Sequence, residues 1–208
     1  MLEPAEAALA RVAESVRPPL SPASRDALLS YVALVYRWQR IANLTGAPDP
    51  ATFVKQHVSD SLSVLPHVGA GPLADIGSGA GLPGLVLAIT QPALEVVLVE
   101  PRGKRARFLE QARIELALPN VSVHAGRVQD WHPLHPPQTL ICRAFASIPD
   151  FLSATLHLQS PGVRMLAMKG DLPEVELAAL DPGRYRSEVF PLEVAGWARR
   201  HLVALDCR

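Results

Sequence analysis

Apolar positions in the N-terminal third of the chain recur at the spacing of an α-helix. Between Ser24 and Arg40 they fall at i, i+3, i+4, i+7 and i+10, in the series Leu28, Tyr31, Val32, Val35 and Trp38. Pro18, Pro19 and Pro22 separate this predicted helix from a shorter one before it. A third helix that ends near Pro66 is predicted from the series Phe53, Val54, His57, Val58 and Leu62. We therefore expect residues 1–70 to form a helical cap in which Trp38 is a core residue.

After residue 70 the pattern changes to short apolar and β-branched runs. These runs predict strands at Leu73–Ile76, Glu95–Glu100, Val121–Val123, Thr139–Cys142 and Val163–Met168. Helical stretches lie between them, at Leu82–Thr90, Lys104–Leu116 and about Pro149–Leu158. This alternation indicates βαβ units on a parallel sheet. Two last strands, Tyr185–Phe190 and His201–Leu205, are joined by a short link, which indicates an antiparallel ending.

The elements together predict an α/β protein with an open, doubly wound, Rossmann-like sheet in residues 71–208. A chain of 208 residues is long enough for one well-cored unit, so we expect the cap and the sheet domain to pack as one body. Apolar residues make up 49% of the chain and charged residues 19%, which excludes general disorder. The 20 basic and 20 acidic residues cancel, which excludes a uniformly basic protein that coats nucleic acid.

Composition also bears on location. The two cysteines, Cys142 and Cys207, form no CxxC motif and fit a reducing compartment. The N-terminus lacks the pattern of a signal peptide, and no run of 18 apolar residues predicts a membrane span. We therefore expect a cytoplasmic protein that is not inserted in a membrane.

A glycine-rich turn follows the first strand. The segment from Leu73 to Gly84 reads LADIGSGAGLPG, so a strand leads into Gly77, Gly79 and Gly81, and a helix is expected to begin near Leu82. Glycines let a ligand lie against bare backbone, and a helix N-terminus presents unpaired N–H groups. Such a turn can also serve folding alone. The strand, the turn, the helix and a second strand that ends in an acid make a nucleoside cofactor the favoured interpretation.

The spacing distinguishes between two such cofactors. Dinucleotide sites carry GxGxxG, whereas these glycines fall as GxGxG, with Leu82 at the place of the third. Asp75, two residues before the first glycine, is typical of sites for S-adenosylmethionine. Glu100 closes the next strand, where a carboxylate can accept hydrogen bonds from ribose hydroxyls. We predict an S-adenosylmethionine site and keep a nicotinamide cofactor as the alternative.

The chain resembles a known family, the bacterial 16S ribosomal RNA guanine-N7 methyltransferases of the glucose-inhibited division B type. The resemblance extends from Tyr31 to the C-terminus and rests on blocks in the same order. They are Trp38 with Asn43-Leu44-Thr45, His57 with Asp60-Ser61, Asp75 to Gly84, Gly103-Lys104-Arg105 with Arg107-Phe108-Leu109, Arg127-Val128, Arg143 to Ser147, Lys169-Gly170 and Arg200-His201-Leu202.

The resemblance implies a Rossmann-like methyltransferase sheet with an N-terminal helical extension. It implies methyl transfer from S-adenosylmethionine to N7 of one guanine in 16S rRNA, with the small ribosomal (30S) subunit or its assembly intermediate as partner. It also implies cofactor contacts by Gly77, Leu82, Val128, Gln129 and Arg143, although Gln129 stands where the family often has an acid. We expect a monomer without a metal ion.

The chemistry of that reaction agrees with what the chain lacks. Guanine N7 presents an in-plane lone pair on the base edge, so no proton has to be removed before attack. No general base is therefore expected, and positioning by Arg143 carries the reaction. Methylation of an exocyclic amine would call for an Asn/Asp-Pro-Pro-aromatic motif after the fourth strand, where this chain has Arg143 to Ala146. The two cysteines are interpreted as packing or tail residues.

Basic side chains supply the predicted grip on RNA. The segment 102–143 holds seven bases against three acids, whereas 171–193 holds six acids and two arginines. Arg102, Lys104, Arg105 and Arg107 begin one helix beside the cofactor strand, a charge run that can also be a solvated face. Three further basic residues follow strands three, four and five, namely Arg127, Arg143 and Lys169. All three are therefore expected at the ligand-binding edge of the sheet.

Other candidates keep two interpretations. Phe145 is expected either to stack on the target base or to pack in the core. His57 and Asp60, at i and i+3 on one helix, are expected to meet and anchor the cap, with a substrate role as the alternative. The pair His132-x-x-His135 lies in a proline-rich loop and is interpreted as surface rather than metal-binding. The alternatives to a methyltransferase are a nicotinamide-dependent oxidoreductase and an RNA-binding module without catalysis.

Overall fold

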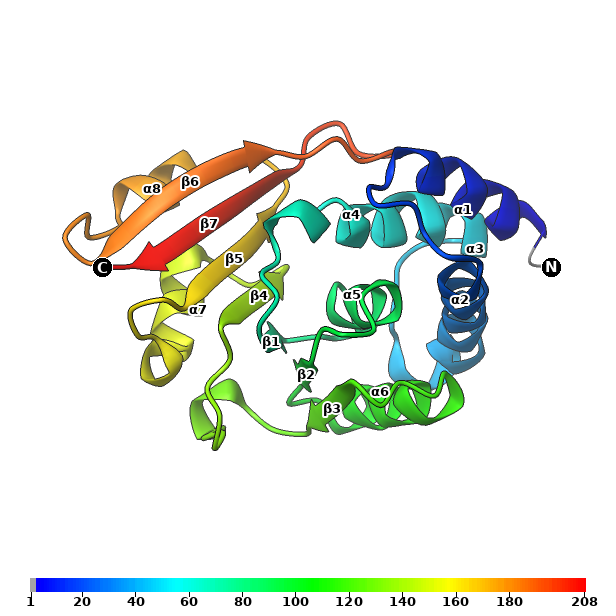
Figure 1. Ribbon diagram of the computed structural model, residues 1–208, viewed down its shortest axis with the longest axis horizontal. Coiled ribbons are helices and arrows are strands. Elements are labelled where there is room, and N and C mark those ends of the chain that lie inside the picture. The colour runs from blue at the N-terminus through cyan, green and yellow to red at the C-terminus, as the bar shows by residue number, and fades with distance from the viewer. Residues whose placement is uncertain (1–2) are drawn as a thin grey trace.

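A twisted sheet forms the centre of the computed structural model, which describes residues 3–208 (Figure 1). The described residues contain seven strands in the order β3-β2-β1-β4-β5-β7-β6. These strands are β1 Leu73–Ile76, β2 Val96–Val99, β3 Val121–His124, β4 Thr139–Arg143, β5 Arg164–Lys169, β6 Tyr185–Pro191 and β7 His201–Cys207. The first five pair in parallel. β7 pairs antiparallel with β5 and β6, so the antiparallel ending is confirmed.

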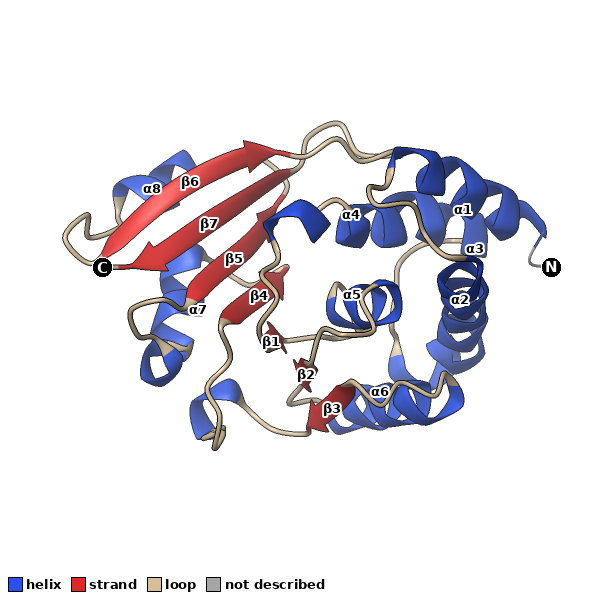
Figure 2. Cartoon of the chain, viewed as in Figure 1, coloured by secondary structure: helices blue, strands red, loops and turns tan. Residues whose placement is uncertain are grey.

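Helices cover both faces of the sheet, which gives three layers (Figure 2). α5 Gly84–Thr90 and α6 Gly103–Glu115 pack into one apolar cluster together with the N-terminal helices. α7 Ile148–Ala154 packs into a second cluster on the other face. α8 Glu174–Ala178 follows β5, and short 3-10 turns lie at Leu65–His67, Val128–Asp130 and Leu156–Leu158. This architecture confirms the predicted Rossmann-like α/β fold.

The cap consists of α1 Glu3–Ser15, α2 Pro22–Ala42 and a third helix with a wide turn in its middle. Ser21 caps α2 by accepting the Ser24 N–H at 3.0 Å, and Asn43 ends it in the left-handed conformation with φ 48°. The third helix runs from α3 Pro50–Phe53 through a π-helical turn Val54–Val58 into α4 Ser59–Leu62. Turns of this kind cluster at functional sites.

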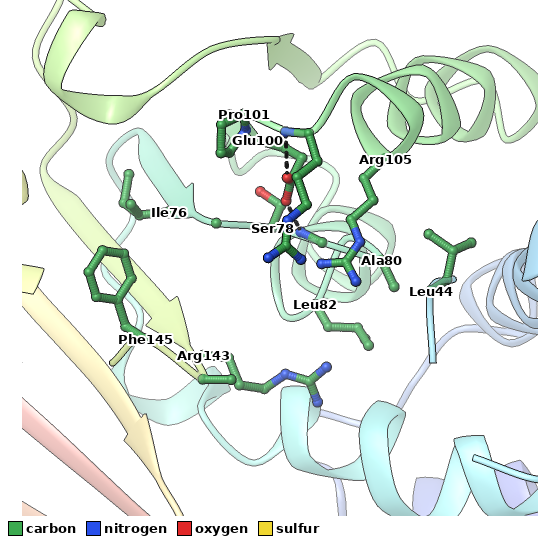
Figure 3. A pocket seen from close by; sticks show the side chains of 14 residues that line it. Leu44, Ile76, Ser78, Ala80, Leu82, Glu100, Pro101, Arg105, Arg143 and Phe145 are labelled. Carbon is green, nitrogen blue, oxygen red and sulfur yellow. Dashed lines mark hydrogen bonds between the residues drawn. The ribbon is translucent and has the colours of Figure 1, made fainter. Parts of the chain in front are cut away.

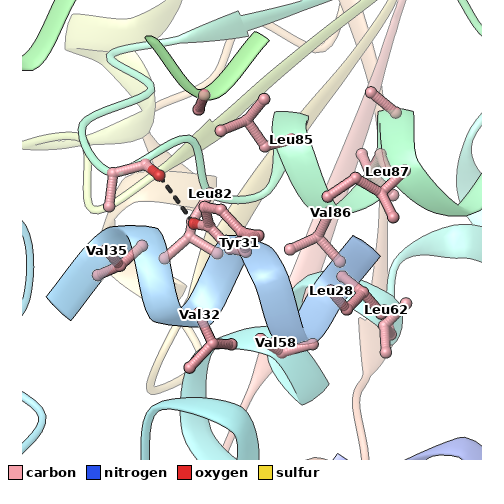
Figure 4. Packing of buried hydrophobic residues seen from close by; sticks show 14 of the residues in the cluster. Leu28, Tyr31, Val32, Val35, Val58, Leu62, Leu82, Leu85, Val86 and Leu87 are labelled. Atoms are coloured by element: carbon pink, nitrogen blue, oxygen red, sulfur yellow. Dashed lines mark hydrogen bonds between the residues drawn. The ribbon is translucent and has the colours of Figure 1, made fainter. Parts of the chain in front are cut away.

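The cap and the sheet domain share one apolar core. Leu28, Tyr31 and Val32 of α2 lie against Val58 and Leu62 on one side and against α5 on the other (Figure 4). These side chains are almost fully buried, and burial of such a side chain stabilises a fold by roughly 1.5–3 kcal/mol. Trp38 is half-buried and packs edge-on against Phe108 of α6, with ring centroids 6.0 Å apart. None of the helices in residues 3–208 is long and apolar enough to cross a bilayer.

Candidate active site

The glycine turn between β1 and α5 lies at the carboxyl edge of the sheet. Gly77, Gly79 and Gly81 have φ angles of 75°, 58° and 87°, which L side chains rarely adopt. A Cβ on Gly77 would point into open space, whereas a Cβ on Gly81 would lie 2.3 Å from Leu85 Cδ1. Gly77 therefore leaves room for a ligand, and Gly81 allows the turn to approach its own helix.

Asp75 lies beneath this turn. It is fully buried, and its Oδ2 accepts the N–H of Gly84 at 2.9 Å. A Cβ on Gly84 would lie 2.4 Å from Leu98 Cδ2 and 2.7 Å from Asp75 Oδ2, so the helix can begin there only at a glycine. Burial raises the pKa of Asp75 to about 7. Asp75 and Gly81 thus shape the turn from below, and the direct cofactor contact expected of them stays a prediction. The helix α5 begins at Gly84 rather than near Leu82.

A cavity of about 310 Å³ opens above the turn (Figure 3). Its walls come from the glycine turn, the end of β2, the start of α6, the end of β4 and the cap. The lining residues are Leu44, Ile76, Gly77, Ser78, Gly79, Ala80, Leu82, Glu100, Pro101, Arg102, Arg105, Arg143, Ala144 and Phe145. The predicted Gly77, Gly79, Leu82, Glu100 and Arg143 are therefore brought together.

A second cavity of about 240 Å³ adjoins the first on the side of β3. It shares Ile76, Gly77, Pro101 and Phe145 with the first, and adds Val99, Arg127, Val128 and Gln129. Phe145 lies between the two cavities and also packs against Phe151 at 5.6 Å, so it has a core contact and a site contact at once. The two cavities make one groove along the carboxyl ends of β2, β1 and β4, where open α/β sheets bind ligands.

Glu100 connects the turn to the start of α6. Its Oε2 accepts the Gly79 N–H and its Oε1 accepts the Arg102 N–H, both at 2.8 Å. The side chain is almost fully buried but lines the cavity. Each carboxylate oxygen has further lone-pair capacity, so Glu100 can hold the turn and still accept a ligand hydroxyl.

Arg143 occupies the centre of a buried polar network between the cavity and the cap. Its Nη1 donates to His57 Nδ1 at 3.1 Å and lies 3.6 Å from Asp60 Oδ2. Asp60, which is 1% exposed, also accepts two hydrogen bonds from Arg200, at 2.7 and 2.6 Å. His57 and Asp60 thus meet through Arg143 instead of directly, and they anchor the cap to the ends of β4 and β7 as expected.

The network has a defined protonation state at neutral pH. Burial lowers the pKa of His57 to about 4, with further lowering by the positive charges of Arg143 and Arg200. His57 is therefore neutral and accepts the Arg143 proton donor at Nδ1, so its own proton is on Nε2. Burial also lowers the pKa of Arg143, an effect that the charge of Asp60 opposes.

Two further contacts close the cap over the glycine turn. The Tyr31 hydroxyl of α2 donates to the Ala80 carbonyl at 2.7 Å (Figure 4). Arg105 Nη2 of α6 donates to the Asn43 carbonyl at 3.0 Å, and the Arg105 side chain forms part of the cavity wall (Figure 3). Arg105, which we expected to bind RNA, therefore lies between the cavity and the cap.

The remaining predicted RNA contacts differ in availability. Arg102 and Arg127 are exposed and line the groove, and Lys104 is exposed two residues after Arg102. Lys169 instead donates to both Glu176 carboxylate oxygens, at 3.1 and 2.8 Å, and its side chain is 14% exposed. Within the described chain Lys169 is thus held in an internal ion pair.

Side chains considered for other chemistry lie apart from the groove. Burial raises the pKa of the Cys142 thiol, which makes it a weak nucleophile. His132 packs against His157, with ring centroids 5.1 Å apart, and residues 3–208 contain no cluster of three or more metal-ligating side chains.

Sequence reasoning missed several wall residues. Leu44 comes from the cap loop after α2 and contacts the site only through the tertiary fold. Ala144 has φ 56°, which turns the chain sharply between Arg143 and Phe145. The role of Gly84 was recoverable, because a glycine at the start of such a helix commonly permits close packing of the helix on the strand.

Comparison with known proteins identifies the family. The family model of rRNA small subunit methyltransferase G, named GidB, matches residues 24–203. The ribosomal RNA small subunit methyltransferase G of Methylobacillus flagellatus is 46% identical over 88% of this chain and 89% of its own. The protein of the same name from Pseudomonas paraeruginosa is 42% identical over 95% and 93%.

Solved structures of methyltransferases share the fold at low sequence identity. A putative O-methyltransferase from Klebsiella pneumoniae superposes with a TM-score of 0.64 at 12% identity, covering 97% of this chain and 96% of its own. A SAM-dependent methyltransferase from Aquifex aeolicus gives 0.59 at 17% identity, covering 82% and 97%. The groove at the sheet edge, the match of the family model and the identity of the relatives lead to one conclusion: this chain belongs to the rRNA small subunit methyltransferase G (GidB) family.

Proposed function

We propose that this protein methylates N7 of one guanine in 16S rRNA with S-adenosylmethionine as cofactor. The observation that carries the proposal is the groove itself, in which an open glycine turn, a buried carboxylate and an anchored arginine converge. Membership of a methyltransferase family favours this reaction over nicotinamide-dependent oxidation and over RNA binding without catalysis.

The residues of the groove fit the proposed cofactor. Bare backbone at Gly77 and Gly79 leaves space for its chain, and Glu100 offers acceptors for ribose hydroxyls. Val128 and Gln129 border the second cavity, where an adenine ring would have an apolar wall and an amide partner. When bound, S-adenosylmethionine supplies an electrophilic methyl group on a sulfonium centre.

The protein's contribution to catalysis is placement. Guanine N7 carries its own lone pair, so the site needs an alignment of about 3–3.5 Å between nucleophile and methyl group, and no general base. The guanine edge also presents the O6 acceptor next to N7. We assign the O6 contact to Arg143, because His57 and Asp60 hold its guanidinium in the cavity wall. A contact to O6 alone leaves N7 free to react and selects guanine over adenine, which presents a donor there.

The partner in this proposal is rRNA within the small ribosomal subunit or its assembly intermediate, encountered by a monomeric enzyme in the cytoplasm. Arg102, Lys104 and Arg127 are proposed phosphate contacts, because Arg102 and Arg127 are exposed along the groove and Lys104 is exposed on the first turn of the helix next to it.

The test uses S-adenosylmethionine labelled with tritium in the methyl group. The purified protein is incubated with small subunits, and separately with naked 16S rRNA, from a strain that lacks the modification. We expect label on a single guanine N7, lost in Arg143→Lys, which keeps the charge but cannot hold the same contacts. Absence of label from 16S rRNA in both substrates, or label on another base atom, would contradict the proposed function.

A further inference from the structure

The loop that joins β6 to β7 carries an exposed tryptophan beside the cap. Trp197 is 42% exposed. It has the bulkiest side chain among the exposed large apolar residues of the described chain. Its indole Nε1 donates to the Gln56 carbonyl of the π-helical turn at 3.0 Å, and the Arg200 guanidinium lies 5.4 Å from its ring centroid. Gly196, with φ 86°, brings the loop against the same turn, since a Cβ there would lie 3.2 Å from Gln56 Cγ. The aromatic ring is thus held in place but remains accessible to solvent.

This arrangement differs from ordinary packing. An exposed indole forgoes much of the stabilisation that burial of so large an apolar group gives. The indole N–H donates a hydrogen bond to the Gln56 carbonyl of the cap, and the Arg200 guanidinium lies over the ring. A fixed, exposed aromatic ring is what proteins use to stack on unpaired bases.

The tryptophan is also connected to the groove. Arg200, which contacts the ring, donates two hydrogen bonds to Asp60, and Asp60 pairs with Arg143 of the cavity wall. A second connection runs through His57, whose ring lies 6.4 Å from Trp197 and whose Nδ1 accepts from Arg143. One residue therefore separates Trp197 from the arginine that we assign to the target guanine.

Two exposed cations lie on the segments around the tryptophan. Lys55 is exposed on the π-helical turn, and the Arg199 side chain is 72% exposed in the same loop as Trp197. Arg199 pairs with Asp171, which is 82% exposed, at 3.3 Å, and Glu193 is an exposed acid of the same loop. Exposed pairs of this kind contribute about 0–1 kcal/mol, so Arg199 can exchange Asp171 for a phosphate at little cost.

We propose that Trp197 stacks on an unpaired rRNA base next to the target guanine, while Lys55 and Arg199 contact the flanking phosphates. The proposal rests on the proposed function in that its ligand is the RNA substrate. Single-stranded segments are the form of RNA that this surface fits, because duplex bases are already stacked and hidden from a side-chain ring.

The first experiment measures binding of the intact protein to a ten-nucleotide single-stranded oligoribonucleotide and to the same sequence as a duplex. We expect the single strand to quench tryptophan fluorescence, and Trp197→Phe to lose most of that signal, since Trp131 is buried and Trp38 is half-buried. Trp197→Ala should weaken binding by about 5- to 100-fold, and Trp197→Phe by much less, because a phenyl ring still stacks. Leu134→Ala, at an exposed apolar residue on the amino edge of the sheet, is the matched control.

Salt dependence separates stacking from charge. Trp197→Ala should leave the slope of log affinity against log salt unchanged, whereas Lys55→Ala and Arg199→Ala should each reduce it by up to about one. Affinity for S-adenosylmethionine should be the same in all three variants, which also reports that the Arg200–Asp60 contacts persist. Unchanged affinity of Trp197→Ala for the single strand would overturn the proposal. If this variant binds only whole subunits more weakly, the proposal is also overturned, because the contact would then be a ribosomal protein. If the wild-type protein shows the Trp197-dependent quench but never labels 16S rRNA, the proposed function fails and the stacking surface stands.

Discussion

Gly77 and Gly84 lie at the two ends of the segment that joins β1 to α5, and they have different roles. Gly77 has φ 75° and faces open space above the turn, whereas the α-hydrogen of Gly84 lies against Leu98 and Asp75. Valine at position 77 would fill the cofactor cavity with a branched side chain and strain the backbone by roughly 1–3 kcal/mol. We expect Gly77→Val to weaken S-adenosylmethionine binding at least tenfold, as measured by isothermal titration calorimetry, with the apolar core unchanged.

Two glycine variants serve as controls for that prediction. Gly84→Ala should instead lower the midpoint of thermal unfolding, because its Cβ would lie within 3 Å of buried atoms. Gly46→Val introduces the same side chain where nothing lies within 4 Å, and should alter neither property. Normal cofactor titration by Gly77→Val would show that the ligand does not occupy the space above this glycine.

His57 provides a test of the buried network through pH. Its pKa is about 4 in the folded chain, against an ordinary value of 6.5. Between those values the unfolded chain binds the extra proton, so the free energy of unfolding falls as pH decreases from 6.5 to 4. The ring is partly exposed, and screening limits the effect to on the order of 1 kcal/mol. His57→Gln keeps an acceptor for Arg143 but does not titrate.

We therefore expect urea unfolding to show a steeper loss of stability for the wild-type protein than for His57→Gln between pH 6.5 and pH 4.5. Asp75 and His67, whose pKa values are also shifted, are present in both proteins and cancel in the difference. Parallel curves over this range would mean that His57 is not held neutral by the network.

What the sequence revealed of the site followed from local rules. Gly77, Glu100 and Arg143 were identifiable because each comes directly at a strand end that the apolar pattern had located. Asp60 and Arg200 lie 140 positions apart and meet only in the folded chain, so no local rule could pair them. Lys169 and Glu176 are only seven positions apart, but this pair was also missed because Glu176 lies on a helix too short to show a period.

The short helix α8 follows β5, the strand that ends in Lys169. All five of its residues keep some solvent exposure, and Glu176 ties it to Lys169 and to the N-terminal N–H of α7 at Ile148, at 2.6 Å. If Lys169 contacts RNA, Glu176 competes with a phosphate for it. We expect Glu176→Gln to free Lys169 and to strengthen binding of 16S rRNA, with a salt-dependence slope up to about one unit larger.

Glu174→Gln is the matched control, because it removes the same charge from an exposed position of the same helix. Binding measured over a salt series should separate the two variants. Equal effects of the two substitutions would show that Glu176 acts only through general repulsion, and that Lys169 is a structural partner of α8. In that case Lys169 would leave the set of RNA contacts.

Element prediction succeeded where the signal was periodic. Strands β1 to β5 are short, largely apolar runs bounded by turn residues, and α2 has a regular apolar face, so both were found within a few residues. The π-helical turn Val54–Val58 was not predicted. Its Gln56 and His57 contact Trp197 and Arg143, which are far away in the sequence, so no local pattern marks the turn. The backbone conformation of this turn therefore depends on tertiary contacts, which the local sequence pattern does not show.

The cap has no core of its own in the described chain, because its buried residues share one apolar cluster with one face of the sheet. One apolar cluster contains Leu28 of α2, Phe53 of α3, Leu87 of α5 and Leu98 of β2. The site uses the same junction, since Leu44 and the contacts of Tyr31 and Arg105 close the cavity from the cap side. A cap that unfolded alone would therefore remove a wall of the cofactor cavity.

We predict that the protein unfolds in one cooperative step. Leu28 and Leu98 are both fully buried, one in the cap and one in the sheet. Leu28→Ala and Leu98→Ala should each lower the free energy of unfolding by about 2–5 kcal/mol. Both should shift the same transition, seen alike by far-ultraviolet circular dichroism and by tryptophan fluorescence, to which Trp38 at the junction contributes. Ile114→Ala, at a residue that is 63% exposed on α6, should shift it little.

An early transition in Leu28→Ala, seen by only one probe, would divide the chain into two independently stable parts. The buried network around Arg143 would then be a contact between domains, and cofactor affinity should fall with that first transition.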